Sequence, residues 1–106
     1  MALELRPAEA AARVEAGEAR LIDVRRDDEL AKSRIPGAEH VPMDRLSARA
    51  ETIDGPLVFV CHLGERSLIA AQAFDASGRE AYSVAGGIEA WARAGLPVDE
   101  GAPLDE

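Results

Sequence analysis

Hydrophobic residues along this chain gather in short apolar runs, which alternate with longer stretches of helix-forming composition. The clearest run, 57–60 (LVFV), is apolar at every position, and this predicts a strand buried on both faces in the middle of a parallel sheet. Shorter apolar runs predict three further strands, at 20–24, 40–42 and 81–84. Helix formers bounded by glycine or polar stops predict the helices, at 7–16, 27–33, 44–52, 67–76 and 88–94.

Strands that alternate with helices in this way predict a three-layer α/β domain, in which helices flank a mostly parallel central sheet of about five strands. A chain of 106 residues is long enough for one such domain with a single core. We expect the domain to occupy residues 1–98 and the acidic stretch 99–106 to be a flexible tail.

Composition and charge exclude several classes of function. Hydrophobic residues make up 47% of the chain and charged residues 30%, which is typical of a globular protein rather than a disordered one. Twelve Lys and Arg against twenty Asp and Glu give a net charge of −8. This charge would repel nucleic acids and anionic membranes at long range, so we expect neither as a partner. The N-terminal region has no long apolar stretch, so we expect no signal peptide or membrane helix, and a cytoplasmic location.

Cysteine and histidine are scarce. The single cysteine, Cys61, excludes an internal disulfide framework and a cysteine-rich zinc site. Two histidines, His40 and His62, are too few to build a metal centre by themselves. We therefore expect neither a metal nor another cofactor.

Cys61 directly follows the most apolar strand, where ligands bind in open α/β sheets. The following residues, 62–67, lead into a predicted helix, so several backbone N–H groups and the helix dipole would point at one spot and favour a thiolate. Gly64 allows a tight turn there, and Arg66 adds a positive charge. A lone cysteine after a strand is more often a small buried apolar residue, but this context favours a reactive one.

These features resemble the single-domain rhodaneses, sulfurtransferases that carry sulfur as a cysteine persulfide. Four segments carry the resemblance, in the family's order and over almost the whole chain: 21–25 (LIDVR), 29–38 (ELAKSRIPGA), 61–67 (CHLGERS) and 86–91 (GGIEAW) with 95–98 (GLPV). The chain departs from the family where Ser33 and Arg34 replace the usual Gly-His before Ile-Pro-Gly-Ala.

The resemblance implies a role for each residue of the third segment. Cys61 is the expected nucleophile, and the expected substrate-binding loop consists of His62, Leu63, Gly64, Glu65, Arg66 and Ser67. Glu65 adds a negative charge that would either weaken the binding of a dianion or point to solvent.

Supporting roles are expected for residues at the neighbouring strand ends. Asp23 and Arg25 would fix adjacent loops by hydrogen bonds, with Glu29 as a partner for Arg25. Gly86 and Gly87 would allow a close approach of the last helix to the sheet. Arg34 is included because of its unusual place in the second segment.

The expected reaction moves a sulfane sulfur from thiosulfate or a persulfide donor, through Cys61, to a thiol, a thioredoxin-like protein or cyanide. One alternative is a persulfide carrier or interaction domain that receives sulfur from a specific protein. Another is a phosphatase or arsenate reductase, but these place five residues between Cys and Arg, whereas four separate Cys61 from Arg66.

Overall fold

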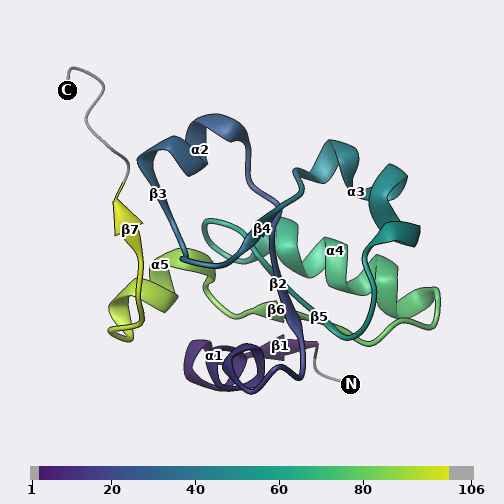
Figure 1. Ribbon diagram of the computed structural model, residues 1–106, viewed down its shortest axis with the longest axis horizontal. Helices are drawn as coiled ribbons and strands as arrows, with labels where there is room; N and C mark the ends of the chain where they lie inside the picture. Colours follow the sequence, from purple (N-terminus) through teal and green to yellow (C-terminus); the bar gives the residue numbers. More distant parts are fainter. Residues whose placement is uncertain (1–2, 101–106) are drawn as a thin grey trace.

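The computed structural model describes residues 3–100, which form a central parallel sheet with helices on both faces (Figure 1). The sheet has five strands in the order β1-β6-β5-β2-β4, and every neighbouring pair is parallel. The predicted three-layer α/β architecture is therefore confirmed. Its strands are β1 (Glu4–Leu5), β2 (Arg20–Asp23), β4 (Glu39–His40), β5 (Leu57–Val60) and β6 (Ala81–Val84).

Two helices cover each face of the sheet. Ala10 and Trp91 bring α1 and α5 into one apolar cluster, whereas Leu46 and Phe74 bring α3 and α4 into the cluster on the opposite face. A shorter helix, α2, follows β2, and a single 3₁₀ turn, η1, follows α3. The bounds are α1 (Pro7–Glu15), α2 (Asp27–Lys32), α3 (Met43–Arg49), η1 (Ala50–Thr52), α4 (Glu65–Ala76) and α5 (Gly87–Arg93).

β5 lies in the middle of the sheet, and all four of its side chains are fully buried. Leu57 and Phe59 pack toward α3 and α4, while Val58 and Val60 pack toward α1 and α5. Burial on both faces explains why this strand is apolar at every position. Cys61 continues the alternation on the Phe59 side, and so its side chain begins under α4.

The structure also contains two-residue strands that the apolar pattern did not predict. β1 pairs with β6, and β3 (Ser33–Arg34) pairs antiparallel with β7 (Asp99–Glu100). Such short strands show no periodicity of their own. Of the expected tail, 99–106, the structure describes Asp99 and Glu100, which form β7, whereas 101–106 lie outside the described residues. No helix within residues 3–100 has the length and apolar character needed to cross a membrane.

A buried ion pair closes the carboxyl end of β2. The Asp23 carboxylate accepts hydrogen bonds from the Arg25 backbone N–H at 3.0 Å and from its Nη2 at 2.9 Å. Arg25 Nη2 also donates to the Ser33 carbonyl at 2.7 Å, which ties the end of β2 to β3. Asp23 and Arg25 thus form hydrogen bonds of the kind expected of them at the end of this strand.

We predict that Asp23→Asn lowers the free energy of unfolding by about 3 kcal/mol, because it leaves the buried Arg25 guanidinium without a counter-charge. Urea denaturation measures this change. The matched control is Arg93→Gln, which breaks an ion pair to Glu89 whose side chains are 75% and 51% exposed, and which should change stability by less than about 0.5 kcal/mol. Equal effects of the two substitutions would contradict the prediction.

Candidate active site

Cys61 lies where β5 ends, with its sulfur inside the turn that leads into α4. Its Sγ accepts hydrogen bonds from the backbone N–H groups of Gly64 at 3.1 Å and Ser67 at 3.3 Å. The Ser67 hydroxyl lies 3.4 Å from the same sulfur. These donors and the N-terminus of the twelve-residue α4 place positive partial charge around Sγ, an arrangement that stabilises a negatively charged sulfur.

The turn depends on Gly64, the residue that precedes α4. Its φ of +105° lies in the left-handed region, which residues with a Cβ rarely adopt. A Cβ there would also lie 3.2 Å from the Gly86 nitrogen. Gly64 thus lets the chain reverse direction so that its own N–H faces Cys61, as the sequence predicted.

A second helix N-terminus holds the outer side of the same loop. Ile88 N–H donates to the Cys61 carbonyl at 2.8 Å, and Glu89 N–H donates to the His62 carbonyl at 3.3 Å. Contact this close requires glycine at the start of α5: a Cβ on Gly87 would lie 2.2 Å from the His62 carbonyl oxygen. The expected close approach is therefore made by Gly87, to the backbone just beyond β5, whereas a Cβ on Gly86 would meet Ala90 of its own helix.

Arg66 points to α2, where its guanidinium forms a two-pronged ion pair with Glu29 (2.7 Å and 2.9 Å). The hydrogen bonds from Arg66 lower the pKa of the Glu29 carboxyl from its usual 4.5 to about 2. The same bonds raise the pKa of Arg66. The expected pairing of Glu29 with Arg25 is wrong, because Arg25 is turned inward to the buried Asp23. The charge of Arg66 is therefore balanced within the protein.

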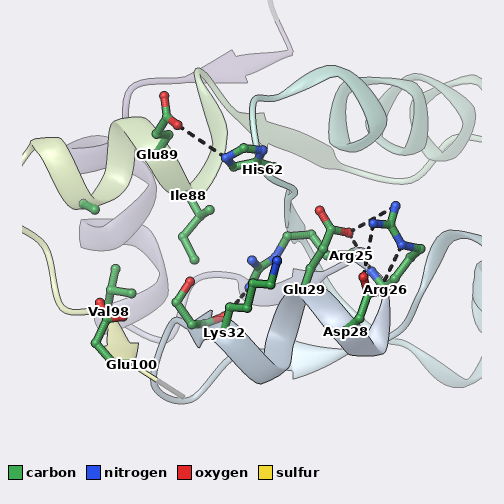
Figure 2. A pocket seen from close by; sticks show the side chains of 12 residues that line it. Arg25, Arg26, Asp28, Glu29, Lys32, His62, Ile88, Glu89, Val98 and Glu100 are labelled. Atoms are coloured by element: carbon green, nitrogen blue, oxygen red, sulfur yellow. Dashed lines mark hydrogen bonds and ion pairs between the residues drawn. The ribbon is translucent and has the colours of Figure 1, made fainter. Parts of the chain in front are cut away.

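The remaining loop side chains face outward. Leu63 is 51% exposed, and Glu65 is exposed at the first position of α4. His62 is exposed too, and its Nε2 lies 3.4 Å from the Glu89 carboxylate (Figure 2). Arg34 is an exposed residue of β3 that pairs with β7, so the structure does not bring it into the loop.

A cavity of about 470 Å³ adjoins the loop between α2 and α5 (Figure 2). It holds charged side chains of both signs, whereas Cys61, only 1% exposed, does not line it. Within residues 3–100, no group of three or more His, Cys, Asp or Glu side chains is placed to bind a metal ion. The lining residues include Arg25, Arg26, Asp28, Glu29, Lys32, His62 and Glu89.

One residue that reaches the sulfur only through Ser67 was missed by the sequence analysis. The Ser83 hydroxyl lies 2.7 Å from the Ser67 hydroxyl, and both residues are fully buried. Ser83 belongs to the segment 81–84, whose composition predicted a strand and nothing more. No local signal identifies it, since only the pairing of β6 with β5 and the packing of α4 bring it to the loop.

Known proteins are similar to this chain in architecture and in sequence. A crystal structure of a rhodanese-related protein from Thermoplasma volcanium superposes with a TM-score of 0.81 at 25% identity, covering 90% of this chain and 95% of that one. Thiosulfate sulfurtransferase GlpE from Actinobacillus succinogenes is 34% identical over 103 residues, which are 91% of this chain and 89% of that protein.

The HTH-type transcriptional regulator Rv0324 from Mycobacterium tuberculosis is 39% identical over 103 residues, or 92% of this chain, which spans only 45% of the regulator's length. The family model of the rhodanese-like domain matches residues 6–94. This match includes the strand end at Asp23, the loop at Cys61 and the glycine pair at the start of α5, and so covers the segments that carried the resemblance except 95–98. The chain belongs to the rhodanese-like domain family.

Proposed function

We propose that this protein is a sulfurtransferase that moves a sulfane sulfur through a persulfide on Cys61. The observation that carries the proposal is the cradle around Sγ, in which two backbone N–H groups and a hydroxyl lie within 3.4 Å of the sulfur. The thiolate is the nucleophilic form of cysteine, and preorganised donors stabilise it without reorganisation during the reaction.

In the first half-reaction, the Cys61 thiolate attacks the outer sulfur of thiosulfate or a similar donor. A new S–S bond forms to Sγ while the donor's own S–S bond breaks, and sulfite leaves with the electron pair. The product is a Cys61 persulfide anion, so charge is conserved. No proton is transferred, and the site needs no general acid for this step.

In the second half-reaction, an acceptor thiolate attacks the outer sulfur of the persulfide. The acceptor becomes a persulfide, and the Cys61 thiolate is released as the leaving group. Because the chain has no second cysteine, the acceptor thiol must come from another molecule, such as a small thiol or a thioredoxin-like protein. The cradle that stabilises the attacking thiolate also stabilises it as the leaving group.

A persulfide carrier fed by a specific protein partner is the second candidate function. Two observations favour it: Glu29 balances the charge of Arg66, which leaves less attraction for a dianion such as thiosulfate, and the apolar Leu63 is exposed two residues from Cys61. Under this alternative, a persulfide donor would load Cys61 much faster than thiosulfate would.

We predict that the wild-type protein gains the mass of one sulfur atom after treatment with thiosulfate or with cysteine persulfide, and that Cys61→Ser gains none. Intact-mass spectrometry measures the adduct, and cyanide should remove it and form thiocyanate. Loading by both donors supports the enzyme, whereas loading by the persulfide alone supports the carrier. If neither donor modifies a wild-type protein with an intact thiol, both proposals fail.

We predict that Gly87→Ala abolishes sulfur loading of Cys61, since the added Cβ would overlap the His62 carbonyl and push the loop away from α5. The matched control is Gly95→Ala. Gly95 has a similar positive φ, but a Cβ there would meet no atom within 4 Å. Both variants therefore have the same backbone strain, of about 1 kcal/mol, and comparable loading by the two would contradict the proposed contact.

The ion pair between Glu29 and Arg66 predicts a pH-dependent stability. Because the folded protein lowers the pKa of Glu29 from 4.5 to about 2, the stabilisation is complete above pH 4.5 and is lost as the pH falls toward 2. We expect Glu29→Gln to be less stable than wild type by about 1 kcal/mol at neutral pH, after allowance for solvent screening. Urea titrations across this range should show the difference shrinking toward acid pH, and the exposed control Glu51→Gln should show no such trend.

A further inference from the structure

The Ser83 hydroxyl is buried in a layer that is otherwise apolar. Ser83 sits on β6 opposite Phe59 of β5, and it faces α4, where Ala70, Ala71 and Phe74 form the core. A hydroxyl in such surroundings is unfavourable unless it is hydrogen-bonded. Its partner is Ser67, whose hydroxyl also lies beside the Cys61 sulfur. A chain of three polar atoms therefore runs from β6 to Sγ.

Which hydroxyl donates in each of these hydrogen bonds follows from counting the hydrogens available. Within residues 3–100, the Ser83 hydroxyl makes one hydrogen bond, to the Ser67 hydroxyl at 2.7 Å. If Ser83 only accepted in this bond, its own hydrogen would have no acceptor in the core, so Ser83 must donate. The hydrogen of Ser67 is then left for one of two acceptors, the Gly64 carbonyl at 3.3 Å or Cys61 Sγ at 3.4 Å.

We propose that Ser83 is a positioning residue, which orients the Ser67 hydroxyl so that it donates to the Cys61 thiolate. The proposal rests on the sulfurtransferase function proposed above. A hydroxyl that accepts one hydrogen bond becomes a stronger donor in the next, and bonds to an ionised acceptor are stronger than neutral ones. The thiolate therefore receives a third donor, beside the N–H groups of Gly64 and Ser67.

This arrangement serves both half-reactions without any proton transfer. When Cys61 carries the persulfide, the negative charge moves to the outer sulfur, and the Ser67 hydroxyl can turn to the Gly64 carbonyl. When the acceptor thiol takes the outer sulfur, charge returns to Sγ and the hydroxyl turns back to it. The Ser83 hydroxyl donates its hydrogen bond to Ser67 in both states. The Ser67 hydroxyl therefore stabilises Cys61 both as nucleophile and as leaving group.

The ultraviolet absorbance of the thiolate tests this directly, because the chain has one cysteine and Cys61→Ser supplies the blank. We expect Ser83→Ala to raise the midpoint pH of the thiolate signal by about half a unit, and Ser67→Ala to raise it by about one unit. In the Ser67→Ala background, Ser83→Ala should add nothing, since Ser83 acts through Ser67. Arg66, the charged group that interacts with Cys61, and its partners Glu29 and Asp23 are the same in all these variants.

Three controls separate positioning from general damage to the fold. Ser77→Ala removes a hydroxyl bonded to the Phe74 carbonyl and should leave the midpoint unchanged. Ser83→Thr keeps the hydroxyl and should retain the wild-type midpoint. If urea denaturation shows that Ser83→Ala is unfolded, Ser83→Cys is the substitute, because it is nearly isosteric and donates weakly. Measured against a Cys61→Ser, Ser83→Cys blank, which subtracts the absorbance of the new thiol, it should show the same rise. The proposal is overturned if the Ser83 variants that lack the hydroxyl titrate like wild type, or if their shift persists without the Ser67 hydroxyl.

Failure of this proposal and failure of the proposed function give different results. If wild-type Cys61 takes up sulfur while the Ser83 variants titrate normally, only the role of Ser83 is rejected. If Cys61 takes up no sulfur from either donor, the sulfurtransferase function is rejected, whatever the titrations show. If both proposals hold, Ser83→Ala should load sulfur several-fold more slowly than wild type below its raised midpoint, where less of Cys61 is thiolate.

Discussion

The contact between two helix N-termini and one short loop is the interaction on which the site depends. The start of α4 turns its N–H groups inward onto the Cys61 sulfur, while the start of α5 holds the carbonyls of Cys61 and His62 from outside. N–H groups of the loop therefore bond inward to the sulfur, while carbonyl groups of the same loop bond outward to the start of α5. A loop held in this way is preorganised for an anion, because no backbone group has to move when charge forms on the sulfur.

Polar contacts elsewhere in the domain hold the elements that surround this loop. The buried pair of Asp23 and Arg25 ties the end of β2 to Ser33, and the pair of Glu29 and Arg66 ties α2 to α4. The second pair also decides the electrostatics of the site. With the charge of Arg66 balanced by Glu29 and the chain carrying a net charge of −8, the proposed binding of an anionic donor would depend on backbone N–H groups more than on side-chain cations.

The fold was largely predictable from sequence, and the reason is visible in β5. A strand buried on both faces has to be apolar at every position, and helices that cover it need glycine stops and one apolar face. The two-residue strands β1, β3 and β7 could not be predicted, because a segment that short has no period. They exist only because longer elements present a strand edge for them to pair with.

For the site, the sequence alone determined the place of Cys61, the length of its loop and the need for Gly64 in the turn, since these are properties of consecutive residues. The tertiary structure decided the partners of the charged and hydroxyl groups. Glu29 pairs with Arg66, thirty-seven residues away, instead of with its near neighbour Arg25, and Ser83 of β6 reaches Ser67 of α4. Side chains bond to groups that are near in space, and the packing of helices on the sheet decides which groups are near. No local sequence pattern encodes that packing.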